Sequence, residues 1–213
     1  MKTDHLIRIL STNLEPVKRG QLGKTLAGAL VIAGLAAFCL MLAVVSVRPD
    51  VAGRAHLPFL AVELLFALGL VAAGAAFLGI SMSPGRDGRK TFALIFLPFV
   101  AIFVAGLVAL ARADSSDWSS TLVGTEWAAC LICIPLFAVM PFGALIWALR
   151  KAAPADLQRT GAIAGLVAGA LGAAAYAFHC PDDSLPFIAI WFSVPIVLCA
   201  FIGATLGPRL LRW

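Results

Sequence analysis

Six long runs of apolar residues, each bounded by charged residues or by glycine and proline, dominate the pattern of hydrophobic and polar positions along the chain. A helix needs about 20 mostly apolar residues to cross about 30 Å of hydrocarbon. The runs cover residues 26–47, 57–82, 91–111, 127–149, 160–178 and 185–206. The pattern therefore predicts an all-α fold, a six-helix transmembrane bundle over residues 26–206, with tails at 1–25 and 207–213.

The composition of the 213 residues supports this prediction, because 62% are hydrophobic and only 13% are charged. A soluble domain is about 45–50% apolar and about 25% charged. The lipid bilayer is therefore an expected partner. The polar connections are too short for a soluble catalytic domain, and the sequence has no phosphate-binding loop, His-Glu-x-x-His motif or nucleophile elbow. We predict a protein that is not an enzyme and holds no resident cofactor.

The distribution of Lys and Arg predicts the orientation of the bundle, since cytoplasmic connections carry an excess of both residues. Thirteen of the sixteen lie in the two tails and the second and fourth connections, against only Arg48, Arg54 and Arg112 in the other connections. Both termini are therefore expected on the cytoplasmic side, an N-in/C-in topology. The net charge of +5 follows from this asymmetry, so we expect no direct binding of nucleic acid.

The N-terminal tail contains a short amphipathic pattern before Pro16. A helix over 3–14 would place four apolar side chains within about 100° of arc, namely Leu6, Ile7, Leu10 and Leu14. Such a stripe fits the surface of a membrane or a groove on a soluble protein. The pattern alone leaves both partners open.

None of the five cysteines lies in a predicted cytoplasmic segment. Cys39 and Cys199 fall inside predicted helices, where a cysteine acts as a small apolar residue. Cys130 lies about one turn into the fourth helix, and Cys180 lies two residues after the fifth. Both are therefore expected at one depth near the outer boundary, in a compartment that tolerates disulfides.

Two further features accompany these thiols. Cys133 forms a Cys-x-x-Cys spacing with Cys130, a spacing associated with redox chemistry and with metals. His179 precedes Cys180 and could add an imidazole ligand for a soft cation, or it could hydrogen-bond at the interface. The acids that follow, Asp182 and Asp183, are expected with Ser184 to cap the sixth helix.

Inside the predicted helices, Glu63 is the one carboxylate, about two turns below the outer surface. An intramembrane ionisable residue is a candidate functional group, or a hydrogen-bonded residue between helices. Gly161, Gly165 and Gly169 recur at every fourth position in the fifth helix, and this stripe predicts close packing, mainly against another helix of the same chain. Kinks are expected at the prolines within the runs, at Pro98, Pro135, Pro141 and Pro195.

Several stretches together resemble the negative regulator of sigma F (NrsF) family over nearly the whole chain. They are MKTDHLIRIL, Arg48-Pro49-Asp50, WAACLICIPLFAVMPFGALIWALRKAAP, AGALGAAAYAFHCPDDS and LGPRLLRW. The resemblance implies a six-pass anti-sigma factor of a bacterial inner membrane that holds an extracytoplasmic-function sigma factor inactive. It maps the functional thiols onto Cys130 and Cys180, and Cys133 departs from the family pattern. It also implies that the sigma factor is the partner of the tail stripe and that oxidation of the thiols, or a transient metal, releases it.

Two other functions are compatible with parts of the sequence. A membrane thiol:quinone oxidoreductase would use Cys130 and Cys133 as its redox pair, but no second outer cysteine pair is present. A small-solute or metal transporter would place Glu63 on the path, but the sequence shows no inverted internal repeat. The sequence does not indicate the oligomeric state.

Overall fold

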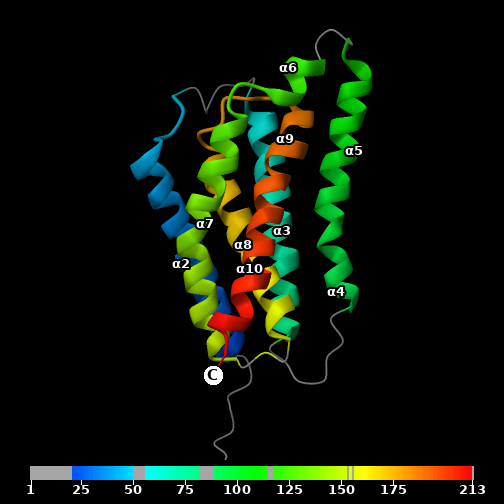
Figure 1. Cartoon of the computed structure of the whole chain (residues 1–213). Coiled ribbons are helices and arrows are strands. Elements are labelled where there is room, and N and C mark those ends of the chain that lie inside the picture. The colour runs from blue at the N-terminus through cyan, green and yellow to red at the C-terminus, as the bar shows by residue number, and fades with distance from the viewer. Residues whose placement is uncertain are drawn as a thin grey trace, which may run out of the picture.

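Long helices make up most of the chain that the computed structural model describes, which comprises residues 21–49, 56–81, 89–114, 118–152, 154 and 156–212. In chain order they are α2 (Gln21–Val44), α3 (Leu57–Ser81), α4 (Arg89–Leu94), α5 (Phe96–Arg112), α6 (Trp118–Val123), α7 (Trp127–Arg150), α8 (Leu157–Tyr176), α9 (Leu185–Trp191) and α10 (Ser193–Leu210). No strand occurs among these residues, so the all-α prediction is confirmed. Figure 1 shows an elongated bundle with the connections gathered at its two ends.

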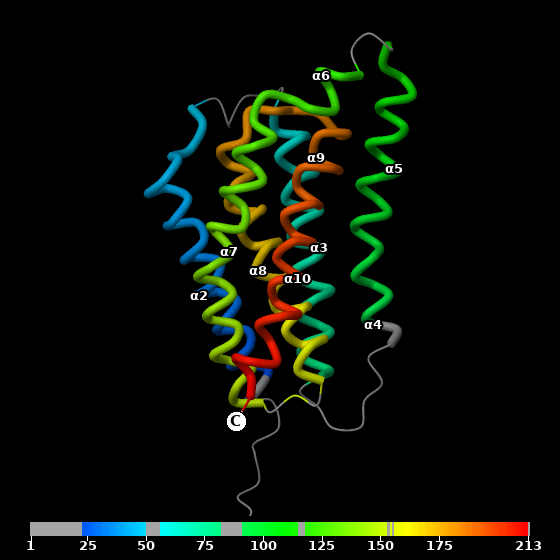
Figure 2. Tube along the Cα trace, in the orientation of Figure 1, coloured from blue at the N-terminus to red at the C-terminus, as the bar shows by residue number. Residues whose placement is uncertain are grey.

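Helix α8 lies at the centre of the bundle, in contact with α2, α3, α7 and α10. Nearly every residue of α8 from 160 to 176 is buried. The trace in Figure 2 shows α8 behind α7 and α10, which run along it. Because protein surrounds α8 on most sides, small residues are favoured over the large apolar residues that lipid would favour.

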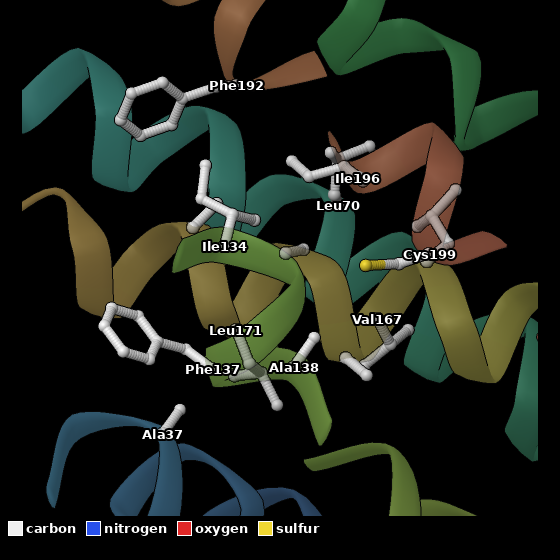
Figure 3. Close-up of a cluster of buried hydrophobic side chains, with 14 of the residues drawn as sticks. Ala37, Leu70, Ile134, Phe137, Ala138, Val167, Leu171, Phe192, Ile196 and Cys199 are labelled. Carbon is white, nitrogen blue, oxygen red and sulfur yellow. The ribbon is translucent and has the colours of Figure 1, made fainter. Parts of the chain in front are cut away.

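The backbones of α8 and α10 touch along a stripe of glycines. A Cβ atom at Gly165 would overlap the carbonyl oxygen of Cys199, and one at Gly203 would overlap that of Gly161. The predicted close packing within the chain is confirmed. Figure 3 shows Cys199 in the same buried cluster as Val167 of α8 and Phe137 of α7.

Five helical segments are long and apolar enough to cross a membrane: Gly23–Val44, Leu57–Ser81, Thr91–Arg112, Trp118–Arg150 and Leu185–Leu210. The fifth predicted segment, 160–178, also forms a helix, α8, but it does not belong to this group. Its glycines and alanines make it less apolar than the helices around it. The sequence therefore predicted the six long helical segments, and five of the six are apolar enough to cross a membrane.

The helix ends differ from the sequence prediction at three places. The third segment breaks at Ile95 into α4 and α5, and the sixth breaks at Phe192 into α9 and α10. Pro98 lies in the first turn of α5, and Pro195 lies in the first turn of α10. The N–H groups of a first turn have no acceptor within the helix, so proline is tolerated there. Helix α6 was not predicted, because its residues belong to no long apolar run.

The two ends of the bundle differ in their residues. We call one the thiol end; it comprises the described residues of 45–56, 113–126 and 177–184, and includes Cys180. The other, the basic end, carries Lys24, Arg150, Lys151, Arg159, Arg209 and Arg212. Figure 1 places α6 at the thiol end, and the start of α2 and the C-terminus at the basic end.

Candidate functional site

The structure brings Cys130 and Cys180 together at the thiol end. Cys130 lies in the first turn of α7 with none of its surface exposed, and Cys180, 3% exposed, follows the end of α8. The amide of Cys180 donates to the carbonyl oxygen of Tyr176 over 3.1 Å, which continues the helical turn past Ala177. The two thiols lie close enough to share a hydrogen bond, and no disulfide joins them in this structure. One small movement would therefore let them form a disulfide.

The pKa of the Cys180 thiol is raised above its ordinary value, first by the contact with the Cys130 thiol and then by burial. Both effects favour the neutral thiol, since the charged form loses hydration when it is buried. A buried neutral thiol is a poor nucleophile. The Cys180 thiol is therefore close to Cys130 but a poor nucleophile in this arrangement.

Glu63, on α3, is also buried, with 3% of its surface exposed. Its carboxyl group is near enough to interact electrostatically with Cys180, Asp183 and Arg48. The candidate intramembrane carboxylate thus belongs to the same cluster as the thiols. Its role stays a hypothesis.

Arg48, just after α2, fixes the segment that carries Cys180. Its backbone amide donates to the carbonyl oxygen of Phe178 over 3.2 Å, and its Nη1 donates to that of Cys180 over 2.8 Å. The same guanidinium group lies 3.4 Å from Oδ1 of Asp183. His56, just before α3, contacts the other carboxylate oxygen of Asp183 through Nδ1 and lies 3.1 Å from Arg48. The segment is therefore held to both α2 and α3.

Asp182 ties the same segment to α7. Its carboxylate accepts bonds from the amide of Thr125 at 3.0 Å and the amide of Glu126 at 2.8 Å. Gly124, which precedes these amides, has φ +60°, and a Cβ atom there would lie 2.6 Å from the ring of Phe187 and 2.8 Å from Asp182. A side chain at position 124 would therefore disturb the contact.

The capping prediction for this segment is correct only for Ser184. Its hydroxyl accepts from the amide of Phe187 at the start of α9. Asp182 instead satisfies amides at the start of α7, and Asp183 pairs with Arg48 and His56. The prediction was wrong for both acids because sequence proximity favours the next helix, whereas folding brings other segments nearer.

His179 contacts the segment after α2 and the ring of Tyr176. Its Nδ1 lies 3.0 Å from the carbonyl oxygen of Ser46, and its ring lies 5.7 Å from that of Tyr176. With Arg48 and Glu126 it lines an open pocket of about 380 Å³. The pocket reaches both neighbours of Cys180 in sequence, His179 and Pro181. Cys180 itself, 3% exposed, does not line the pocket.

The other candidate residues lie apart from the pair or outside the described residues. Cys133 is half-buried one turn deeper on α7, Cys39 is exposed on α2, and Cys199 is buried on α10. Among the described His, Cys, Asp and Glu residues, no group of three or more could hold a metal ion. The tail residues predicted to contact a sigma factor fall outside the described part of the chain: Leu6, Ile7, Leu10 and Leu14.

Two residues of this site, His56 and Tyr176, were not predicted from the sequence. Tyr176 is the last residue of α8 and is fully buried beside the thiols. Being the chain's one tyrosine, four residues before Cys180, it could have been identified from the sequence. His56 could not have been paired with Asp183, because 127 residues separate them.

These features define a helical protein with five segments apolar enough to span a membrane and a buried pair of thiols at one end of the bundle. The chain belongs to the NrsF family, the negative regulators of sigma F, whose family model matches residues 10–213. The family named from the sequence is confirmed.

Two curated proteins are similar to this chain, and each similarity covers the full length of both sequences. The chain is 31% identical over 214 residues to the probable anti-sigma-F factor NrsF of Azospira oryzae. It is 31% identical over 215 residues to the anti-sigma-F factor NrsF of Caulobacter vibrioides. No solved structure matches the chain significantly.

Proposed function

We propose that this protein is a membrane-bound anti-sigma factor that holds an extracytoplasmic-function sigma factor at the basic end and releases it when Cys130 and Cys180 are oxidised. Membership of the family and the names of the two relatives support the regulatory role. The observation that carries the sensing role is the contact between the two buried thiols. The function is regulatory and involves no enzymatic turnover.

The membrane location rests on the five apolar segments and on the charge distribution. Thirteen Lys and Arg against three favour a cytoplasmic location for the basic end and for both termini. The thiol end then faces outward from a bacterial inner membrane. Disulfides persist in that compartment.

The sigma factor would bind the apolar stripe of the N-terminal tail. Helix α2, which follows the tail, begins at the basic end, where the C-terminus also lies (Figure 1). The basic end thus offers exposed cationic groups next to the point where the tail enters the bundle. An apolar helix face of this length fits a groove on a soluble protein.

A disulfide at the thiol end would act on the basic end through α8. Cys180 follows α8 directly, and the glycine stripe holds α8 against α10 with no side chains between their backbones. A shift of α8 would therefore move α10, whose last turn carries Arg209. Full release needs about 5.5 kcal/mol of differential affinity. One disulfide contributes about 2 to 4 kcal/mol, so the expected response is partial release.

A soft metal ion bridged by the two thiolates is a second candidate signal, favoured by the same thiol contact. The described residues offer no third ligand of the usual kinds, so such an ion would take two ligands from this pair. Intact-mass measurement of unreduced protein distinguishes the two states. A disulfide lowers the mass by two hydrogens, whereas a bound metal raises it.

The test replaces each thiol and measures transcription from a promoter that depends on the partner sigma factor. With Cys130→Ser or Cys180→Ser we expect the promoter to stay silent after an oxidant is added. Cys39→Ser, an exposed cysteine on α2, is the matched control and should respond normally. A normal response from both variants of the pair would exclude the thiol sensor.

The binding site is tested separately by capturing the sigma factor on purified protein. Deletion of residues 2–15 should abolish capture, as should the double change Leu6→Asp and Leu10→Asp. Thr12→Ala, on the opposite face of the predicted helix, should leave capture intact. Full capture by the deletion would move the binding site to the cytoplasmic loops.

A further inference from the structure

The side chain of Tyr176 fills the space between the thiol pair and the core of the bundle. It is fully buried, with its ring centroid 6.4 Å from that of Phe137, 6.2 Å from that of Phe192 and 5.7 Å from that of His179. Its carbonyl oxygen accepts the amides of His179 and Cys180. The residue therefore packs the end of α8 against Phe137 of α7 and against Phe192.

The hydroxyl group of Tyr176 is unusual because it is buried without a hydrogen-bond partner among the described residues. It interacts electrostatically with both thiols and is near enough to Cys130 for a weak hydrogen-bonding contact, yet no hydrogen bond of regular geometry joins it to either sulfur. A buried hydroxyl without a partner destabilises a fold, and phenylalanine would fill the same space without that cost. The unpaired donor beside two sulfurs points to a state in which one sulfur accepts it.

We propose that the Tyr176 hydroxyl donates a hydrogen bond to the thiolate of Cys130 as that thiolate attacks oxidised Cys180, which makes Tyr176 a catalytic residue of disulfide formation. This inference rests on the proposed redox function. A thiolate accepts hydrogen bonds far better than a neutral thiol. The hydroxyl therefore interacts only weakly with the neutral thiol at rest and more strongly with the thiolate during the reaction.

The oxidant in this step is a peroxide, and the pocket lined by His179 and Pro181, the residues on either side of Cys180, is its route of approach in this proposal. Cys180 loses its proton, its sulfur bonds to one peroxide oxygen, the O–O bond breaks, and the departing hydroxide takes the proton to give water. Cys130 then loses its proton and attacks the sulfenic sulfur of Cys180. The S–S bond forms, the S–O bond breaks, and the hydroxide released takes up the second proton. Two thiols are oxidised, and hydrogen peroxide is reduced to two waters.

The other polar groups near the pair are less suited to this task. Asp183 is already paired with Arg48 and His56, and its carboxylate accepts hydrogen bonds and does not donate them. Arg48 already binds the carbonyl oxygen of Cys180 and the carboxylate of Asp183. The titratable and charged groups that face the pair or Tyr176 are Glu63 from α3, Cys133 from α7, Arg48 after α2, and His179, Asp182 and Asp183 after α8.

The expected size of the effect follows from how a donor acts on a thiolate. A donor that gives about tenfold more thiolate lowers its nucleophilicity about threefold, because the Brønsted coefficient is about 0.4 to 0.5. The net gain at neutral pH is about threefold. At a pH high enough to ionise the thiol without the hydroxyl donor, the rate advantage disappears. The lower nucleophilicity then makes the reaction slower with the donor than without it.

The test follows the fate of sulfenic acid on Cys180 in the purified full-length protein. Hydrogen peroxide is added with dimedone, which traps the sulfenic acid before Cys130 attacks it. At pH 7 we expect the ratio of dimedone-labelled Cys180 to disulfide to be about threefold higher in Tyr176→Phe than in the wild-type protein. The difference should vanish as the pH is raised. Packing alone would not produce this pH dependence.

Two controls separate the possible outcomes. Ser193→Ala removes the other buried hydroxyl that lacks a partner in the described part of the chain, and it should leave the ratio unchanged. Tyr176→Phe should melt at the same temperature as the unchanged protein or higher, because it removes only an unpaired donor. An equal ratio in Tyr176→Phe at every pH would overturn the role of Tyr176 alone. If the wild-type protein forms no disulfide when peroxide is added, the proposed redox function is wrong as well.

Discussion

The two ends of the bundle are held in different ways. At the thiol end, bonds join residues far apart in sequence: Arg48 binds Cys180 and Asp183, and Asp182 binds Thr125 and Glu126. At the basic end, most bonds of the described residues are local. Arg159 pairs with Asp156 three residues away, both well exposed, and Lys151 lies 3.6 Å from the ring centre of Trp147.

This difference indicates a division of labour. The thiol end is organised in advance, so that two sulfurs meet with little further ordering. The basic end leaves most of its cationic side chains in solvent, where a partner can reach them; Arg150, which binds the carbonyl oxygen of Leu210, ties α7 to α10 there. The glycine contact between α8 and α10 is the rigid link that connects the two ends.

Breaking that link should have the largest effect. Gly165→Ala places a methyl group on the backbone of α10 and forces the helices apart. We expect a loss of about 3 kcal/mol in the free energy of unfolding, measured by SDS titration in mixed micelles. Gly28→Ala is the matched control, since no atom lies within 4 Å of the added Cβ. Equal stability of the two variants would show that α8 and α10 are not in backbone contact.

The second effect compares an arginine at each end. Arg48→Ala removes the bonds to Cys180 and Asp183 at a site only 13% exposed, so we expect a loss of about 2 kcal/mol. The thiols would also meet less often. A tenfold drop in their effective concentration raises the reduction potential of the disulfide by about 30 mV.

Arg159→Ala at the basic end is the control for this comparison. Its pair with Asp156 is 74% and 50% exposed, so the expected loss is below about 0.5 kcal/mol. The reduction potential of the Cys130–Cys180 disulfide should stay the same. A potential that shifts equally in both variants would contradict the division between the ends.

The helices could be predicted from the sequence, whereas the network at the thiol end could not. Apolar runs and the glycine spacing are local signals, and they located the long helices and the stripe at Gly161, Gly165 and Gly169 correctly. The contacts of Arg48, His56 and Asp183 depend on which loops meet after folding. Spacing along the chain does not encode that information, and it assigned Asp182 to the wrong helix.

The third effect compares the two helix starts that an aspartate caps. Asp182→Ala leaves the amides of Thr125 and Glu126 at the start of α7 without their acceptor, so we expect a loss of about 1.5 kcal/mol. Asp156→Ala removes one bond to the amide of Arg159 at the exposed start of α8 and should cost about 0.5 kcal/mol. Denaturant titration of both variants checks the order. A larger loss for Asp156→Ala would reverse the proposed comparison.

The smallest effect comes from the raised pKa of Cys180, which makes the thiol end sensitive to alkali. Above about pH 8.5 the unfolded chain loses the Cys180 proton, while the folded chain keeps it. The folded state then binds more protons than the unfolded state, so stability present below pH 8.5 is lost as the pH rises. At pH 9 the loss is about 0.8 kcal/mol by this linkage. Cys180→Ser has no proton to lose and should show a flatter stability profile between pH 8 and 9. An identical profile would mean that the thiol is not protected by its contact with Cys130, and the organised character of the thiol end would then rest on Arg48 and Asp182 alone.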